Sequence, residues 1–327
     1  MTMQFPKVLL FAFLLGTVGT TATGATKNTV RIATWNLEWL IAPEDFLALA
    51  NSCLPRDASP GTRERYIPCN VAREHERSNL DFRALARYAD VLGADVVALQ
   101  EVDGPKAARR VFRNHDFCFT ARAGVQNNGF AIRKGIPHRC GEDLVALSLG
   151  DRVRRGAELI LYPGTAREFR LLSVHLKSGC PRRPLDSAGR DCETLARQVP
   201  ELERWIDDQA AAGRRFGVLG DFNHDLLGFD GPARNEQGQL RNFWAEIDDG
   251  TPAGADLLNV AEGQAFMNCA PGQNYRSYID HVVLGATLAA WRMPNSFVRV
   301  TYEADDARQR KLADHCPVGV DLQLPSP

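Results

Sequence analysis

The sequence of 327 residues lacks a strong charge of either sign, because 39 lysines and arginines stand against 40 aspartates and glutamates, a formal net charge of −1. A partner bound through bulk charge alone is therefore not indicated, although a local basic groove remains possible. The chain also lacks an internal repeat and any low-complexity segment. With 44% hydrophobic and 24% charged residues, disordered and collagen-like classes are excluded, and one large folded domain or two ordinary ones remain.

A long apolar run is missing as well, and the one apolar stretch near the N-terminus is short. Lys7 precedes the apolar residues 8–15, and small and polar residues follow. About 20 apolar residues are needed to span a bilayer. This arrangement is typical of a secretory signal peptide, with a short membrane anchor as the alternative. We expect residues 1–25 to be the signal peptide and residues 26–327 to form a secreted or periplasmic protein without stable membrane insertion.

No C-x-x-C pair occurs among the eight cysteines, which argues against a zinc site or a dithiol redox centre. An even number of cysteines behind an export signal indicates disulfides, because oxidising compartments allow them to persist. The sequence alone leaves the connectivity open. Near-neighbour closure favours the pairs Cys53–Cys69, Cys118–Cys140 and Cys180–Cys192, which leaves Cys269–Cys316.

The hydrophobic pattern predicts many strands and few helices. Residues 81–92 and 194–212 have apolar side chains at helical spacing. Residues 41–77 are polar and rich in proline and arginine, which predicts an insertion loop closed by Cys53 and Cys69. Such a pattern favours an α+β or layered sandwich in a single domain. Apolar or alternating runs predict strands at residues 29–34, 95–100, 129–133, 158–162, 169–175, 216–220, 279–284, 296–302 and 318–324.

Polar side chains that can perform chemistry stand at the ends of these strands and in the loops that follow. Mg²⁺ prefers carboxylate and amide oxygens and keeps water molecules for chemistry. Phosphoryl transfer also needs a base for water and donors for the charge that grows on the phosphate. The pattern therefore predicts a metal-assisted hydrolase. The candidate residues are Asn36, Glu101, His175, Asp221, Asn223, Asp280, Asp314 and His315.

Six ordered blocks carry these residues: TWNLE, ALQEVDG, VHLKS, GDFN, YIDH and ADHCPV. In this order the chain resembles the endonuclease/exonuclease/phosphatase superfamily, whose members are similar to deoxyribonuclease I, over residues 29–324. The resemblance implies a DNase I-like fold of the α+β class, a four-layer α/β sandwich. In this fold, helices flank two face-packed mixed β-sheets, and the site lies at one rim. It also implies a hydrolase that uses a divalent cation, Mg²⁺ with Mn²⁺ or Ca²⁺ as alternatives.

The resemblance assigns the metal and the water. Glu101 matches the principal metal ligand of the family, Asn36 matches an asparagine near metal and phosphate, and Asp314 matches a carboxylate that adds to the metal shell. Asp221 and Asn223 match the pair that orients the attacking water and a phosphate oxygen.

The resemblance also implies two catalytic histidines. His315 matches the general base and Asp280 its carboxylate partner. An Asp–His pair fixes the tautomer of the imidazole and raises its basicity, which suits proton transfer near neutral pH. His175 matches a histidine of the deoxyribonuclease- and sphingomyelinase-like branches that contacts the phosphate or the leaving group. Abasic-site endonucleases carry Asp at the position of Glu38 and Tyr at that of His175, so this branch is disfavoured.

Several basic and hydroxyl side chains are candidates for substrate phosphate, because nucleic-acid binding requires lysine and arginine along the phosphate track. Lys177 and Ser178 follow His175 closely, and Arg182 and Arg183 lie in the loop between Cys180 and Cys192. Two further clusters, residues 152–155 and 308–311, are equally compatible with a solvated surface. His224 and His281, beside the motif residues, are interpreted as structural.

Three functions remain in order of preference. The first is an exported endonuclease that acts on DNA or RNA by metal- and histidine-assisted attack of water, and we expect it to be a monomer. The second is a phospholipase C- or sphingomyelinase-type lipid phosphodiesterase, disfavoured because the loops are polar and no apolar hairpin faces a membrane. The third is a binding protein that kept the fold and lost activity, which the chemically competent residues at every motif position disfavour.

Overall fold

The computed structural model describes residues 1–2, 28–55, 65–228 and 242–326. Apart from its first two residues, the segment expected to be a signal peptide lies outside this described part. Within the described part, no helix is long and apolar enough to cross a membrane.

The first of two six-stranded sheets has the order β11-β12-β1-β2-β4-β3. Strands β1 and β2 are parallel, and the other neighbouring pairs are antiparallel. The strands are β1 (Thr29–Leu40), β2 (Val96–Val102), β3 (His115–Phe119), β4 (Asn127–Arg133), β11 (Val298–Arg299) and β12 (Val318–Gln323).

The second sheet has the order β5-β6-β7-β8-β10-β9 and again contains one parallel pair, β7 with β8, among antiparallel neighbours. Its strands are β5 (His138–Cys140), β6 (Ala157–Leu161), β7 (Phe169–His175), β8 (Phe216–Asp221), β9 (Leu257–Asn259) and β10 (Asp280–Gly285).

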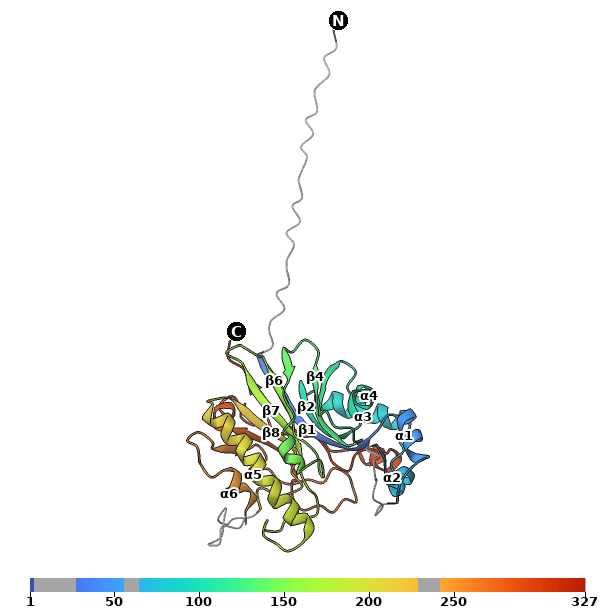
Figure 1. The fold of residues 1–327 in the computed structure, drawn as a ribbon. Coiled ribbons are helices and arrows are strands. Elements are labelled where there is room, and N and C mark those ends of the chain that lie inside the picture. Colours follow the sequence, from blue (N-terminus) through green and yellow to red (C-terminus); the bar gives the residue numbers. More distant parts are fainter. Residues whose placement is uncertain (3–27, 56–64, 229–241, 327) are drawn as a thin grey trace.

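Alternation along the strands creates three apolar layers. Ile32 of β1 and Leu171 of β7 belong to the core between the sheets. Trp35 of β1 faces the outer core beneath the helices on the first sheet, and Val218 of β8 faces the outer core on the second. Figure 1 shows α3 and α4 on one side of the paired sheets and α5 and α6 on the other. The expected four-layer sandwich is therefore confirmed.

Local sequence signals explain the two long helices. Ser78 and Asp81 form a capping box at the start of α3, and Gly93 ends this helix in the left-handed conformation. Helix α5 begins at Arg190, earlier than the apolar spacing predicts, because its first turn buries Cys192. The helices are α1 (Pro43–Ala50), α2 (Cys69–Glu74), α3 (Asn79–Leu92), α4 (Gly104–Val111), α5 (Arg190–Ala211), α6 (Phe243–Ile247), α7 (Ala286–Ala289) and α8 (Ala304–Gln309), with a 3₁₀ turn at Val145–Ser148.

Three short strands, β3, β5 and β9, were not predicted, because each is too short to establish an apolar period. The strand expected at residues 296–302 pairs only at Val298–Arg299. The segment 41–77 is more than a loop, since it contains α1 and α2. These helices bury a small apolar cluster that includes Phe46, Ile67 and Val71.

All eight cysteines form disulfides in the structure, in the pairs that near-neighbour closure favours: Cys53–Cys69, Cys118–Cys140, Cys180–Cys192 and Cys269–Cys316. Four disulfides suggest a protein of an oxidising compartment, extracellular or periplasmic.

Candidate active site

The strand register of the second sheet brings three candidate residues to one edge. His175 lies opposite Asp221 in the parallel pair of β7 and β8. Asp280 lies opposite the same Asp221 in the antiparallel pair of β8 and β10. Because β10 enters the sheet where β7 and β8 end, all three side chains come from one row of the sheet. All three residues are buried.

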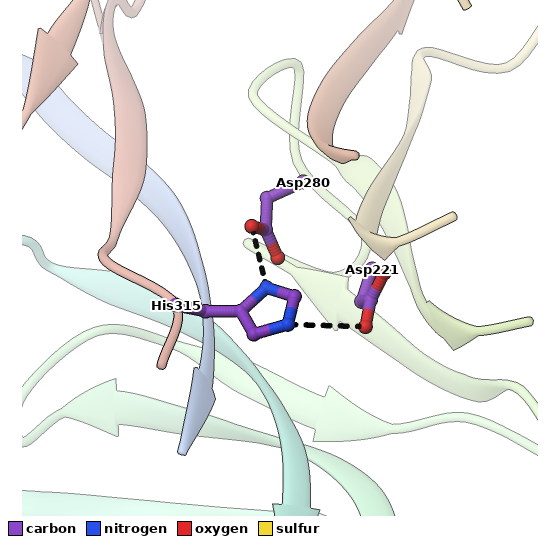
Figure 2. Close-up of side chains that lie close together, drawn as sticks. All are labelled: Asp221, Asp280 and His315. Carbon is purple, nitrogen blue, oxygen red and sulfur yellow. Dashed lines mark hydrogen bonds and ion pairs between the residues drawn. The ribbon is translucent and has the colours of Figure 1, made fainter. Parts of the chain in front are cut away.

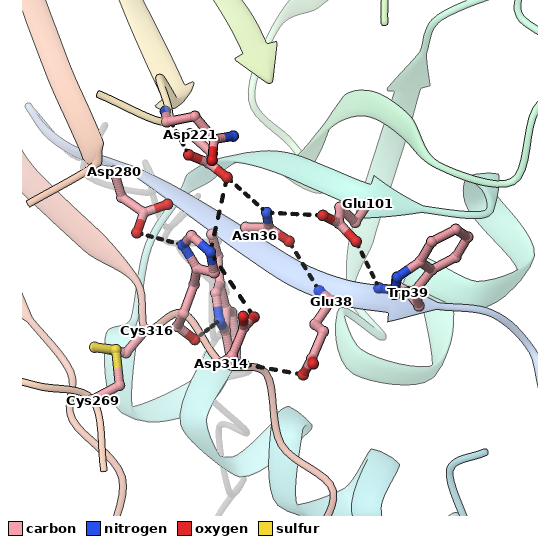
Figure 3. Close-up of polar contacts among 12 residues, drawn as sticks. Asn36, Glu38, Trp39, Glu101, Asp221, Cys269, Asp280, Asp314 and Cys316 are labelled. Atoms are coloured by element: carbon pink, nitrogen blue, oxygen red, sulfur yellow. Dashed lines mark hydrogen bonds and ion pairs between the residues drawn. A yellow bond between two sulfur atoms is a disulfide. The ribbon is translucent and has the colours of Figure 1, made fainter. Parts of the chain in front are cut away.

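The first sheet supplies Asn36 and Glu101 from the carboxyl ends of its parallel pair. Asn36 Nδ2 donates to Asp221 Oδ2 at 3.0 Å and to Glu101 Oε1 at 3.4 Å. The amide orientation is fixed because Asn36 Oδ1 accepts from the backbone N–H of Glu38 at 3.0 Å. Asn36 therefore joins the two sheets at the site, as Figure 3 shows.

The backbone around this junction is strained. Glu38, Trp39, Glu101 and Asn223 have φ of 44°, 52°, 60° and 53°, in the left-handed region that non-glycine residues rarely adopt. Between Asn36 and Leu40 the pairing of β1 with β2 shifts register. The irregularity allows the backbone N–H of Trp39 to donate to Glu101 Oε2 at 3.2 Å. Strain of this kind concentrates at functional sites, where it aims a side chain.

His315 and Asp280 form a hydrogen-bonded pair. His315 Nδ1 lies 2.7 Å from Asp280 Oδ2, and the other ring nitrogen, Nε2, lies 3.8 Å from Asp221 Oδ2 (Figure 2). Burial by itself would lower the pKa of His315, but the carboxylates of Asp280 and Asp221 outweigh it and raise the pKa well above the ordinary value. Asp280 thus leaves Nε2 as the ring atom that faces the site.

His175 is the second histidine of the site and has the opposite electrostatic character. Its Nε2 lies 3.4 Å from Asp221 Oδ2 and 3.8 Å from Glu101 Oε1. Burial, together with the positive charge of Arg154, lowers its pKa well below the ordinary value, so the ring is neutral. Its Nδ1 is buried and has no hydrogen-bond partner in the described part of the chain.

Asp221 lies between the two histidines. Burial and the negative charge of Asp280 raise the pKa of Asp221 to about 7. The charge of His315 and the hydrogen bond from Asn36 act in the opposite direction. Asp221 Oδ1 accepts from the backbone N–H of Asn223 at 2.8 Å, and Asn223 Nδ2 donates to the carbonyl of Leu176 at 3.1 Å. The turn after β8 is thereby held in a fixed shape.

Glu38 and Asp314 extend the acidic edge. Glu38 Oε2 accepts from the backbone N–H of Asp314 at 3.1 Å, and its carboxylate also lies near His75 and Arg77. Burial and the charge of Asp314 raise the pKa of Glu38 to about 7. Asp314 itself is more open, with 43% of its side chain exposed.

This donor set fits a divalent cation. Several carboxylates converge, and the raised pKa values of Glu38 and Asp221 express burial and mutual repulsion that a cation would relieve. Among the described residues, Glu101 Oε1 accepts one long hydrogen bond, from Asn36, and lies 3.8 Å from His175 Nε2, so it is available to a hard cation. One oxygen each of Asp221 and Asp280 and one ring nitrogen of His315 also lie within 4.8 Å of one another, which makes a second possible donor group.

A hydrogen-bonded chain behind Glu101 was not predicted. Gln126 Nε2 donates to Glu101 Oε2, and Arg154 Nη2 donates to Gln126 Oε1. In the sequence Arg154 belongs to the cluster 152–155, which is compatible with a phosphate contact or a solvated surface, so no pattern pointed to its contact with Gln126. Within that run, Arg155 is engaged by Asp151 and Asp143.

The expected phosphate contacts occupy the loop between β7 and α5. Lys177 Nζ forms an ion pair with Asp191 at 2.7 Å, and Arg183 Nη2 donates to the carbonyl of Ala188 at 2.6 Å. Ser178 is exposed. Arg182 lines a cavity beside His315 and lies 3.6 Å from Asp225 Oδ2.

His224 and His281 are buried away from solvent. His281 Nε2 bonds to the carbonyl of His224 at 3.0 Å, and Asn259 Nδ2 lies 3.0 Å from His281 Nδ1. His224 Nε2 bonds to the carbonyl of Arg183 at 3.0 Å. These contacts support the interpretation of both residues as structural.

A model of the Endonuclease/Exonuclease/phosphatase family matches residues 33–298. No curated protein sequence matches the chain. Among solved structures, TDP2 of D. rerio, complexed with a single strand DNA product, is 18% identical with a TM-score of 0.51 and covers 90% of this chain and 98% of its own. TDP2 of C. elegans is 12% identical with a TM-score of 0.52, and the match covers 90% of this chain and 75% of that one. The mannosyl-6-phosphatase Bt3783 of Bacteroides thetaiotaomicron is 13% identical with a TM-score of 0.50, and the match covers 89% of this chain and 98% of that one. At these identities the likeness shows the fold alone.

Proposed function

Because the chain belongs to the endonuclease/exonuclease/phosphatase family, we propose that it is an exported, divalent-metal-dependent phosphodiesterase whose substrate is DNA or RNA. The observation that carries the proposal is the double hydrogen bond from Asn36 to Glu101 and Asp221. It holds Glu101, whose carboxylate can bind a cation, beside Asp221, whose carboxylate can orient water. The Asp280–His315 pair lies next to Asp221.

The cation would be held by Glu101, with Asn36 and Asp314 as neighbours. When bound, it would polarise the phosphate and neutralise charge that develops on it. Mg²⁺ is the expected ion, because the donors are oxygens.

The protein's own side chains supply the proton transfers. Asp221 and Asn223 orient the attacking water, since Asp221 Oδ2 points between the two histidines. His315 Nε2 accepts or returns a proton, because its Nδ1 is committed to Asp280. His175 Nε2 faces the same oxygen of Asp221 and contacts the phosphate or the leaving group.

Two observations support a nucleic acid as the substrate. Arg182, Arg276 and Arg299 line the cavity next to His315, so positive charge adjoins the reacting phosphate. Among the described residues, the exposed large apolar side chains belong to different elements, among them Leu47 of α1, Val91 of α3 and Leu227 after β8, which does not favour a bilayer-directed surface. One solved structure of this fold holds a single strand DNA product, which is an observation on that protein.

The apolar stretch at residues 8–15 and the four disulfides support the proposed export. In this proposal, residues 1–25 are removed and residues 26–327 act as one domain in the periplasm or outside the cell.

The test is a panel of plasmid DNA, RNA, sphingomyelin and bis-p-nitrophenyl phosphate, each with Mg²⁺ and with EDTA. We expect hydrolysis of one nucleic acid and of bis-p-nitrophenyl phosphate that EDTA abolishes. Cleavage of sphingomyelin alone would favour the lipid phosphodiesterase, and no cleavage at all would favour the inactive binding protein.

The Glu101→Gln variant tests the metal assignment within the same panel. An amide keeps the shape of the side chain but loses its charge, so we expect weaker Mg²⁺ binding in calorimetry and a higher Mg²⁺ requirement. Glu262→Gln, an exposed glutamate, is the matched control. Equal Mg²⁺ affinity in wild type and Glu101→Gln would contradict the assignment.

A further inference from the structure

A cavity of about 340 Å³ adjoins the proposed catalytic residues and extends beyond them. His315, Asp280 and Asn223 are part of its lining. Arginines and aromatic rings that take no part in the proposed proton transfers also line it: Arg182, Arg276, Arg299, Phe266 and Tyr275. At the lower end of the range for ligand sites, about 300–1,000 Å³, it has room for one substrate unit and not for a duplex.

Arg299 is the unusual residue of this cavity. Its guanidinium lies over the rings of Tyr278 and Phe266, with 4.8 and 5.3 Å to their centroids. Nη2 donates to the sulfur of Cys269 at 3.4 Å, which is a weak acceptor. Nε and Nη1 are buried and have no hydrogen-bond partner in the described part of the chain.

Leaving N–H groups of a charged side chain buried without acceptors costs free energy, so an acceptor is expected from outside the described chain. Asp280 is the acid whose charge acts on Arg299. However, no hydrogen bond or ion pair joins Asp280 to Arg299 within the described residues: Asp280 Oδ2 accepts from His315, and the buried Oδ1 has no hydrogen-bond partner there. A guanidinium with free N–H groups is suited to a phosphate oxygen.

The wall that carries Arg299 is fixed to the catalytic loop. The Cys269–Cys316 disulfide connects the segment before Tyr275 to the residue after His315. Gln273 Nε2 donates to the carbonyl of Asp314 at 2.8 Å, and Gln273 Oε1 accepts from the backbone N–H of Cys269 at 2.9 Å. The cavity therefore keeps a constant position relative to His315.

We propose that this cavity binds the substrate unit next to the scissile phosphate and that Arg299 binds a second, flanking phosphate of the same strand. The proposal rests on the proposed nuclease function and adds a substrate requirement to it. Tyr275, which is 51% exposed at the rim, presents a ring on which the base of that unit can stack. The preferred substrate is then a single strand with at least two consecutive phosphates.

The test compares thymidine dinucleotides that carry no terminal phosphate, a 5′ phosphate or a 3′ phosphate, with bis-p-nitrophenyl phosphate as a substrate without a flanking phosphate. We expect wild type to prefer one of the two phosphorylated dinucleotides, which also identifies the side of the flanking phosphate. Arg299→Gln should reduce that preference in kcat/KM by about tenfold or more, because a charge-assisted hydrogen bond is lost. The loss on bis-p-nitrophenyl phosphate should be smaller.

Arg139→Gln, an exposed arginine on the edge strand β5, makes the same charge change away from the cavity and should alter neither substrate. Arg299→Lys keeps the charge without the paired N–H groups, so it should lose part of the preference and serves if Arg299→Gln folds poorly. An equal loss on all substrates, or a wild type without preference for a flanking phosphate, would overturn the subsite.

An inhibition arm separates this proposal from the nuclease proposal. If wild type hydrolyses bis-p-nitrophenyl phosphate and no dinucleotide, the nuclease function fails. Inhibition of bis-p-nitrophenyl phosphate hydrolysis then decides the subsite. Thymidine 3′,5′-bisphosphate should inhibit wild type more strongly than either thymidine monophosphate does, and it should lose that advantage in Arg299→Gln. Equal inhibition by the bisphosphate and the monophosphates would overturn the subsite.

Discussion

Asn36 Nδ2 lies 3.0 Å from Asp221 Oδ2, and this hydrogen bond connects β1 of one sheet to β8 of the other. The same amide reaches Glu101, so one side chain separates two buried or partly buried carboxylates. Its function is both structural and electrostatic. An acidic site between two sheets needs a donor to offset repulsion when no cation is present.

The first prediction concerns Asn36→Asp. A carboxylate of the same shape cannot donate to Glu101 or Asp221 and adds a third charge. We expect the free energy of unfolding to fall by about 3 kcal/mol without metal, in the range for an unpaired buried charge. Mg²⁺ should restore more stability to the variant than it adds to wild type.

Denaturant unfolding with EDTA and with Mg²⁺ measures the effect, with Asn114→Asp, an exposed asparagine, as the control. A variant that loses stability equally under both conditions would show that repulsion between the carboxylates is not the cause.

The second prediction concerns the Cys180–Cys192 disulfide, which closes the loop that carries Arg182. With a sequence separation of 12, the bond should contribute about 3 kcal/mol by restricting the unfolded chain. The double variant Cys180→Ala/Cys192→Ala should lose about this stability. Its kcat/KM should fall more on a dinucleotide than on bis-p-nitrophenyl phosphate, since the loop borders the cavity and not the reacting atoms.

Urea unfolding and steady-state kinetics measure the two effects. Replacing Cys118 and Cys140, which link β3 to β5, is the matched control for the kinetics. If both double variants change substrate preference alike, the loop has no part in binding.

The third prediction concerns pH and the buried His281. Asn259 Oδ1 accepts from the backbone N–H of Ala261, so its Nδ2 donates to His281 Nδ1, and His281 Nε2 donates to the carbonyl of His224. These bonds fit the neutral ring, and burial lowers the pKa of His281 from 6.5 to about 4. The unfolded chain therefore binds the proton first as the pH falls. The stability from the neutral ring is complete above about pH 6.5 and is lost between pH 6.5 and about 4.

The loss amounts to about 3 kcal/mol over that window. Buried acids titrate too, so the measured quantity is the difference in unfolding free energy between wild type and His281→Gln. This difference should fall as the pH is lowered from 6.5 to 4. A difference that is constant across the window would contradict the assignment of a neutral His281.

The fold and the grouping of most candidate residues could be predicted from the sequence, because several of these residues stand at or near the end of a strand. Asn36, Glu101, His175 and Asp221 all terminate apolar runs, and parallel pairing carries such ends to one edge. The structure supplies what spacing cannot: the register that places Asp280 opposite Asp221, and the left-handed backbone at Glu101.

Residues whose role depends on burial could not be predicted. Arg154 stands in an arginine run, and only the packing of β4 against β6 and β7 shows that it supports Gln126. Arg299 lies on a two-residue strand, and its unpartnered N–H groups exist only in the folded chain. The sequence pattern around Arg154 is compatible with a solvated surface, and the pattern around Arg299 predicts a strand; in neither case does it show the tertiary contacts that decide the role of the arginine.

The last prediction concerns the Asp280–His315 pair. If His315 Nε2 transfers a proton while Asp280 holds Nδ1, His315→Ala should lower kcat/KM by about 10⁴-fold or more. Acid–base catalysis alone supplies about 10²–10⁴-fold, and the same ring also stabilises charge on the phosphate. Asp280→Asn should also lower turnover strongly, because an amide can hold the wrong tautomer of the ring. The double variant should be little worse than His315→Ala, since members of one catalytic unit are not additive.

As a control, Lys177→Met, whose ammonium pairs with Asp191, should combine multiplicatively with His315→Ala. Melting temperatures establish that each variant is folded before kcat/KM is compared on the same phosphodiester. Were the losses from Asp280→Asn and His315→Ala to multiply as well, the 2.7 Å contact between them would be structural and not part of the catalytic step.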